Sequence, residues 1–176
     1  KNIFRMPDRD NPDGDNSIRL WSHQAQAIAK ALQRRSFVVT TGTGSGKSLC
    51  FFIPIIDAIL KGKAQDSTPR TRAVVVYPMN ALANSQLDEL RKFLGDRQDI
   101  TFARYTGQES QEERQRIRQS APDILLTNFM MLEMLMTRQD SLDQNVLENC
   151  RDLHFIVLDE LHTYRGRQGA DVAMLM

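Results

Sequence analysis

A glycine-rich segment between two apolar runs constrains the fold of this chain more than any other feature. The segment reads Thr40-Thr41-Gly42-Thr43-Gly44-Ser45-Gly46-Lys47-Ser48, and it lies between Phe37-Val38-Val39 and the apolar run 49–56. This pattern predicts a strand over 36–41, a tight turn, and then a helix to about residue 61. Backbone N–H groups converge in such a turn, and the helix N-terminus adds partial positive charge. The segment therefore predicts a polyphosphate site.

The residues of this turn have separate predicted roles. Lys47 would reach the terminal phosphates of a nucleoside triphosphate, and the Ser48 hydroxyl would ligate Mg²⁺. The strict pattern has glycine five residues before Gly46, where this chain has Thr41. The alternative is a chance glycine-rich turn. The expected nucleotide-binding residues of the loop are Thr43, Gly44, Ser45, Gly46, Lys47 and Ser48.

An acidic pair follows the last apolar run of the chain. Residues 153–158 read as a buried strand, and Asp159-Glu160 come directly after it. The carboxyl ends of parallel strands face the crevice in which open α/β sheets bind ligands. Asp159 would hold Mg²⁺ together with Ser48, and Glu160 would orient and activate the attacking water. The alternative for this pair is an ordinary solvated acidic turn.

Composition sets broad limits on this protein. The chain has 176 residues, 41% hydrophobic and 26% charged, as expected for a globular domain with a real core. A net charge of +1 neither indicates nor excludes nucleic-acid binding, because amides and hydroxyls can also hold phosphates. Cys50 and Cys150 form no Cys-x-x-Cys motif, and no run is long enough for a membrane span. We expect a cytoplasmic protein without membrane association.

The remaining pattern alternates strands and helices. After a polar lead-in at 1–17, a helix capped by Ser22 is expected to run to about Arg34. Further strands are predicted at 73–77, 100–105 and 124–126, with helices from Leu82 to Leu94 and at 109–119, 129–137 and 141–149. The charged helix 109–119 predicts a solvated face, and Met130, Met131, Met134 and Met136 are expected in the core. This order predicts an α/β fold with a mostly parallel sheet and helices on both faces.

With further motifs in the right order, the chain resembles the first RecA-like domain of superfamily 2 helicases of the DEAD/DEAH-box type. The resemblance covers about residue 20 to the end, so the expected domain is 18–176, truncated at its C-terminus. It implies ATP and Mg²⁺ as cofactors and ATP hydrolysis coupled to movement along nucleic acid. It also implies a second RecA-like domain of the same chain, so we expect this piece alone to be nearly inactive.

The resemblance extends to the nucleotide base and the nucleic-acid strand. The segment 20–28 looks like the Q motif, in which Gln24 would read adenine; the alternative is a surface glutamine on a capped helix.

The segment 77–86 resembles motif Ia but has Pro-Met-Asn for Pro-Thr-Arg, so Asn80 would make a weaker phosphate contact in place of the arginine. Segments 105–107 and 122–128 resemble two strand-binding motifs. The implied nucleic-acid residues are Pro78, Asn80, Thr106, Gly107, Thr127 and Asn128, with plain capping or turn roles as the alternative.

The tail Asp159-Glu160-Leu161-His162-Thr163-Tyr164-Arg165-Gly166 resembles a branch of large bacterial and fungal DNA helicases in repair or anti-phage defence. That branch favours DNA over RNA, held through its backbone, and allows partner proteins of a larger system. His162 would couple the ATP site to the second motor domain, which places it with Lys47, Asp159 and Glu160 among the catalytic residues. Alternatives are an RNA helicase, a P-loop ATPase of another class, and a non-catalytic scaffold.

Overall fold

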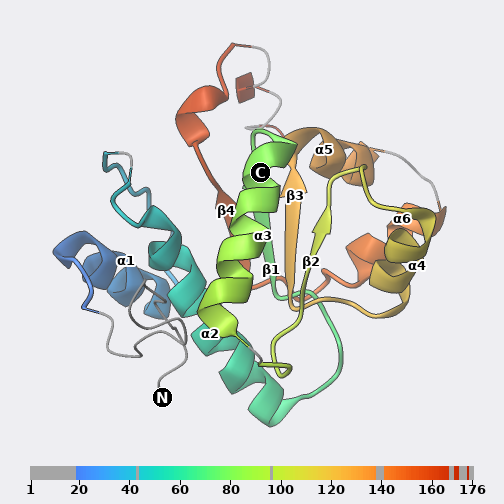
Figure 1. Cartoon of the computed structure of the whole chain (residues 1–176), viewed down its shortest axis with the longest axis horizontal. Helices are drawn as coiled ribbons and strands as arrows, with labels where there is room; N and C mark the ends of the chain where they lie inside the picture. Colours follow the sequence, from blue (N-terminus) through green and yellow to red (C-terminus); the bar gives the residue numbers. More distant parts are fainter. Residues whose placement is uncertain are drawn as a thin grey trace. The chain divides into compact units, whose positions relative to one another are not determined.

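A computed structural model describes residues 19–42, 44–95, 97–137, 141–166, 169–170 and 174 (Figure 1). The predicted lead-in at 1–17 and Thr43 of the glycine-rich loop lie outside the described residues. The chain divides into two compact units. One runs as far as Ser67 and includes Arg91–Ile100, and the other comprises Thr68–Leu90 and the chain from Thr101 onward. Within the described residues, no helix combines the length and the apolar character that crossing a membrane requires.

The first unit is built on a helix pair. α1 (Ser22–Leu32) packs against α2 (Lys47–Gln65), and Ala27 and Cys50 are buried in this unit. The predicted strand over 36–41 is wrong, because residues 35–42 have no regular secondary structure. A strand is stable only when a neighbouring strand completes its hydrogen bonds, and every strand that the structure describes belongs to the other unit.

The second unit contains a four-stranded parallel sheet with the strand order β2-β3-β1-β4 (Figure 1). The strands are β1 (Ala73–Tyr77), β2 (Phe102–Tyr105), β3 (Ile124–Asn128) and β4 (Phe155–Leu158). They confirm the four strands predicted for this part of the sequence. β1 is an apolar run that is buried throughout, and β3 is buried over its first four residues, as expected for strands that are covered on both faces. Because Tyr77 pairs with Asn128, the carboxyl ends of β1 and β3 lie at the same edge.

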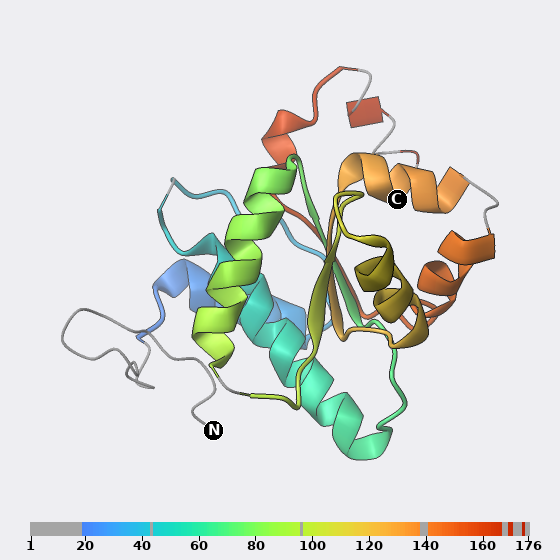
Figure 2. The same cartoon turned by 45° about the vertical axis from the view of Figure 1, so that its right-hand side comes forward.

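Helices cover both faces of this sheet, as predicted. Figure 2 shows α4 (Gln111–Gln119), α5 (Phe129–Thr137) and α6 (Ser141–Glu148) on one side and α3 (Asn80–Leu94) on the other. Val74 and Val76 belong to the apolar cluster beneath α4, α5 and α6. Since side chains alternate along a strand, the buried Val75 points to the opposite face.

The methionines of α5 only partly meet the expectation of core packing. Met131 is buried, but Met130 is 68% exposed and Met136 is 48% exposed. The prediction is wrong for these two residues because α5 buries only the face that carries Phe129, Met131, Leu132 and Leu135.

A buried ion pair closes the amino edge of the sheet. Arg72 and Asp123 have side chains only 0% and 2% exposed, and Nη1 of Arg72 donates to Oδ1 of Asp123 at 2.8 Å. The other carboxylate oxygen of Asp123 accepts both the N–H and the hydroxyl of Thr101, each at 2.8 Å. The carbonyl of Arg72 accepts the N–H groups of His154 and Phe155. This amino-edge ion pair therefore joins the segments that lead into all four strands.

Candidate functional site

The glycine-rich loop has the backbone that a phosphate-binding turn requires. Gly44 and Gly46 have φ angles of +74° and +68°, in the left-handed region that favours glycine. Gly46 is the N-cap of α2, so the helix begins directly at Lys47. The turn and the helix therefore form where the sequence predicts them, although the strand before them does not.

The side chains of the loop are held by internal hydrogen bonds. Nζ of Lys47 donates to the carbonyls of Thr41 and Gly42, at 3.2 and 3.4 Å. Thr41, which replaces the glycine of the strict pattern, shares a 2.6 Å hydrogen bond between its hydroxyl and that of Ser45. The ammonium of Lys47 thus lies against neutral carbonyls of the loop, where a phosphate oxygen would be a stronger partner.

Gln24 is brought directly to this loop. Its side chain is almost fully buried, and Nε2 donates to the carbonyl of Gly46 at 2.9 Å. Its Oε1 accepts the N–H of Trp21 at 2.9 Å, so Gln24 caps α1. The predicted cap at Ser22 is wrong, since Ser22 is the first helical residue and Trp21 occupies the N-cap position. A Cβ at Gly46 would lie 2.7 Å from Nε2 of Gln24, so a side chain there would displace the end of Gln24 from this position.

The acidic pair lies where β4 ends. The N–H of Asp159 donates to the carbonyl of Val76 at 2.9 Å, which extends the sheet pairing one residue past Leu158. Glu160 then has a φ of +49°, an uncommon conformation for a residue other than glycine, and its N–H donates to Oδ1 of Asp159. A 3₁₀ turn, η1 (Leu161–Thr163), follows. Nδ1 of the exposed His162 lies 3.2 Å from Oε2 of Glu160, so the structure joins these two predicted catalytic residues.

Burial and the nearby carboxylates raise the pKa of two tyrosines at this edge of the sheet. Burial, with the negative charge of Asp159 as the second cause, raises the pKa of Tyr164 to about 12. Burial and the charges of Asp159 and Glu89 also raise the pKa of Tyr77 well above its ordinary value. The ring of Tyr164 packs against Phe129 with 5.8 Å between the ring centroids.

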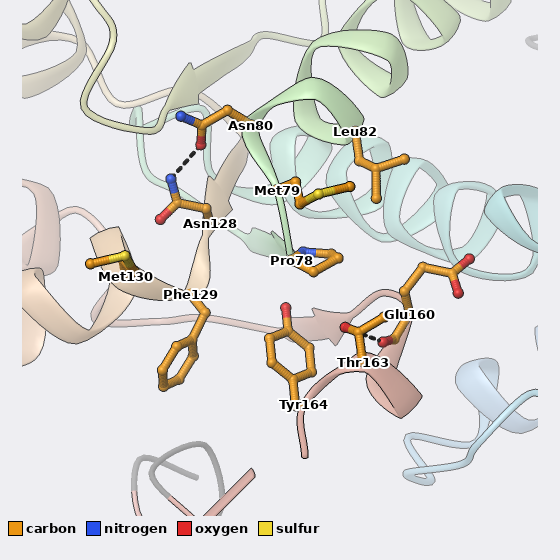
Figure 3. Close-up of a pocket in the computed structure, with 10 residues that line it drawn as sticks. All are labelled: Pro78, Met79, Asn80, Leu82, Asn128, Phe129, Met130, Glu160, Thr163 and Tyr164. Carbon is orange, nitrogen blue, oxygen red and sulfur yellow. Dashed lines mark hydrogen bonds between the residues drawn. The ribbon is translucent and has the colours of Figure 1, made fainter. Parts of the chain in front are cut away.

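A pocket of about 660 Å³ lies at the carboxyl ends of β1, β3 and β4 (Figure 3). It combines Glu160 with three of the predicted nucleic-acid residues, Pro78, Asn80 and Asn128. Its other lining residues are Met79, Leu82, Phe129, Met130, Thr163 and Tyr164. The structure therefore brings a predicted hydrolytic residue and predicted strand-binding residues to the same cavity.

Asn128, the last residue of β3, connects the start of α3, the turn after β2 and the first turn of α5. Its Nδ2 donates to Oδ1 of Asn80 at 2.5 Å, as Figure 3 shows, and to the carbonyl of Thr106 at 3.1 Å. Its Oδ1 accepts the N–H of Met131 at 2.6 Å. Thr127, in contrast, is fully buried, and its hydroxyl donates to the carbonyl of Tyr105 at 2.6 Å. The structure thus joins Asn80, Thr106 and Asn128 but does not bring Thr127 to this surface.

Sequence reasoning missed Glu109, which was assigned to the solvated helix 109–119. The helix begins only at Gln111, and the buried Glu109 lies in the turn before it. Burial alone would raise the pKa of Glu109, but hydrogen bonds from Thr106 and Arg104 bring it below its ordinary value. A sequence signal was available, since Ser110 and Glu113 form a capping box that starts the helix after Glu109.

A parallel α/β sheet with an acidic pair at one strand end, together with a glycine-rich turn that opens a helix, defines a chain of the RecA-like class. Comparison with known proteins gives the family. The family model for DEAD/DEAH box helicases matches residues 21–176, and the chain belongs to this family.

Similar proteins include two curated relatives and a solved structure. The chain is 37% identical over 155 residues to the uncharacterized ATP-dependent helicase YprA of Bacillus subtilis (strain 168), covering 88% of this chain and 19% of that protein. It is 31% identical over 167 residues to the ATP-dependent helicase HRQ1 of Saccharomyces cerevisiae, covering 89% and 14%. The crystal structure of the DUF1998 helicase MrfA bound to DNA matches with a TM-score of 0.73 and 31% identity, over 99% of this chain and 23% of that one. The chain thus spans at most about a fifth of the length of these curated relatives.

Proposed function

We propose that the protein is an ATP-dependent DNA helicase or translocase and that this chain is its first motor lobe. The pocket at the carboxyl edge of the sheet is the observation that supports this function best (Figure 3). There Glu160, the proposed hydrolytic residue, lines the same cavity as Asn80 and Asn128, the proposed strand-binding residues. A change of shape at this cavity during hydrolysis would reach the nucleic acid directly, and a motor requires such coupling.

The proposed ATP site draws on both ends of the sequence. Gln24 would read the adenine, and the glycine-rich loop with Lys47 would hold the phosphates. The oxygen ligands of Ser48 and Asp159 suit Mg²⁺, which would neutralise charge on the phosphates. Glu160 would orient the attacking water and accept its proton.

DNA is the favoured track over RNA. A structure similar over 99% of this chain is that of a helicase bound to DNA, whereas the ATP-dependent RNA helicase DBP9 of Gibberella zeae is 30% identical over only 59% of it. Contacts from Pro78, Asn80, Gly107 and Asn128 would address the nucleic-acid backbone, whereas Thr106 and Thr127 are buried.

The setting of this motor belongs to the same proposal. A second RecA-like domain of the same chain would close over the ATP, and partner proteins would direct the motor in DNA repair or defence against foreign DNA. The free thiols of Cys50 and Cys150 support a reducing, cytoplasmic compartment.

The test is ATP hydrolysis by the intact protein, alone and with single-stranded DNA, duplex DNA or RNA. We expect stimulation by DNA that exceeds stimulation by RNA. Lys47→Ala is expected to weaken triphosphate binding, whereas Lys61→Ala, an exposed change in the same helix, serves as the control. If ATP binds but no nucleic acid stimulates hydrolysis, the proposal of a motor is wrong and a scaffold is favoured. If RNA stimulates hydrolysis more strongly than DNA, the proposal of DNA as the track is wrong.

A further inference from the structure

The carboxylate of Glu109 is the centre of a hydrogen-bond network in the turn after β2. Its Oε2 accepts the backbone N–H groups of Thr106 and Gly107, at 2.8 and 2.9 Å. Its Oε1 accepts the hydroxyl of Thr106 at 2.9 Å and Nε of Arg104 at 2.7 Å. The Glu109 side chain is only 3% exposed. Both oxygens are therefore saturated by donors from the turn itself and from the strand before it.

The network reaches two neighbouring elements, α3 and the end of β3. Arg104 also donates through Nη1 to Oδ1 of Asn84, which lies in the first turns of α3. On the other side, the carbonyl of Thr106 accepts Nδ2 of Asn128, which also bonds Asn80. The turn that Glu109 organises is thus bonded to the start of α3, which follows β1, and to the last residue of β3.

The same contacts determine which groups of the turn remain available to bind a phosphate. Two adjacent backbone N–H groups form a natural site for an anion, and here the internal carboxylate of Glu109 already fills it. Displacing the carboxylate would leave a buried charge with Arg104 as its main partner, which is costly. A nucleic-acid phosphate would instead meet the exposed outer side of Gly107 and the neighbouring Arg114, whose Nη2 donates to the carbonyl of Gly107 at 2.7 Å.

We infer that Glu109 is a positioning residue for nucleic-acid binding. It holds the turn after β2 against the start of α3 and the end of β3, so that Asn80, Gly107 and Asn128 together present a surface to the nucleic-acid backbone. This inference rests on the proposed function, and it assigns Glu109 an indirect role with no contact to nucleic acid.

The experiment uses the intact protein with Glu109→Ala, Glu109→Gln and the matched control Glu112→Ala, which removes an exposed carboxylate of the same α4 region. Single-stranded DNA is titrated into ATP hydrolysis assays, and thermal unfolding confirms that each variant is folded. We expect the DNA concentration for half-maximal stimulation to rise about tenfold in Glu109→Ala, the scale of lost charge-assisted hydrogen bonds. The rate at saturating DNA and the KM for ATP should change less than about twofold.

Glu109→Gln keeps the size of the side chain and one acceptor oxygen for the two N–H groups, so its effect should lie between those of wild type and Glu109→Ala. Glu112→Ala should match wild type. If Glu109→Ala also matches wild type, the inference is wrong. If it binds DNA more tightly, Glu109 is an inhibitory phosphate mimic and the inference is equally wrong. Absence of DNA stimulation in the wild-type protein would instead overturn the proposed function and, with it, this inference.

Discussion

The two edges of the parallel sheet are built in opposite ways. At the amino edge, Arg72 and Asp123 are buried, and both oxygens of Asp123 have hydrogen-bond partners. At the carboxyl edge, an open pocket is rimmed by the exposed Met79 and Met130, and Glu160 has an uncommon left-handed backbone (Figure 3). One edge uses polar groups to join strands, and the other leaves polar and apolar groups accessible to a ligand.

This difference indicates which changes act on folding and which act on chemistry. A buried ion pair costs much desolvation, so losing one partner leaves the other charge uncompensated. Exposed groups at the carboxyl edge are expected to have little effect on stability, and they are accessible to a ligand. We therefore expect substitutions at the amino edge to act through stability and substitutions at the carboxyl edge to act through activity.

The largest effect is expected for Asp123→Ala at the amino edge. Removing this carboxylate takes a charged partner away from the buried guanidinium of Arg72 and should cost about 3–5 kcal/mol of stability. Amide hydrogen exchange of β1 and β3 in the intact protein measures this loss. The exposed Asp152→Ala, which removes the partner of Arg70, is the control and should change exchange little. If hydrogen exchange were equally fast in Asp123→Ala and Asp152→Ala, the stabilising role given to the buried ion pair of the amino edge would be wrong.

Next in size is Glu160→Gln at the carboxyl edge. The amide keeps the shape of the side chain but cannot accept a proton from water, so ATP turnover of the intact protein should fall about a hundredfold or more. ATP binding and the hydrogen exchange of β4 should not change. Glu148→Gln, an exposed change on α6, is the control. A Glu160→Gln protein with wild-type turnover would refute the assigned role.

A smaller, pH-dependent effect is expected for Glu109. This residue lies at the carboxyl edge, but its carboxylate is buried and hydrogen-bonded, as that of Asp123 is at the amino edge. Its folded-state pKa is below the ordinary value, so the ionised carboxylate stabilises the fold at neutral pH. That stabilisation, about 1–2 kcal/mol, should disappear as the pH falls through the lowered pKa. The difference in unfolding free energy between wild type and Glu109→Gln, measured from neutral pH into the acid range, tests this. A difference that grows with acid would contradict it.

The smallest effect is expected for Met130→Ala. Because this side chain is 68% exposed, its removal should change stability by less than about 0.5 kcal/mol. Met131→Ala, the neighbouring change on the buried face of α5, should cost about 2 kcal/mol or more. Thermal unfolding of both variants sharpens the comparison of accessible and buried groups within one helix, and similar losses in both would contradict the assigned faces.

Local patterns predicted most of the fold. The run Ala73–Tyr77 forms β1 with the predicted bounds, and the helix predicted at 129–137 is α5. Apolar runs and periodicity suffice there because the apolar residues that define the pattern are the ones whose burial against the sheet stabilises these elements. The predicted strand at 36–41 is wrong for a non-local reason, since the described residues of its own unit provide no partner strand.

The candidate site was predictable where a motif carries its own geometry. The glycines at 44 and 46 have the left-handed φ that the loop pattern implies, and Asp159-Glu160 follow β4 as expected. The contacts of Glu109 and Thr127 were not predictable, because each depends on which way a side chain points after the chain has folded. The Glu109 side chain turns back onto its own loop, and the Thr127 hydroxyl donates to the carbonyl of Tyr105 in the neighbouring β2.

The contact between Gln24 and Gly46 couples the glycine-rich loop to the start of α1. A Cβ at position 46 would lie 2.7 Å from the amide of Gln24, in addition to the strain of the left-handed backbone there. The end of the Gln24 side chain would have to shift, which would disturb its hydrogen bonds to the carbonyl of Gly46 and to the N–H of Trp21. A substitution at Gly46 would therefore also act on the cap of a helix that begins more than twenty residues earlier in the sequence.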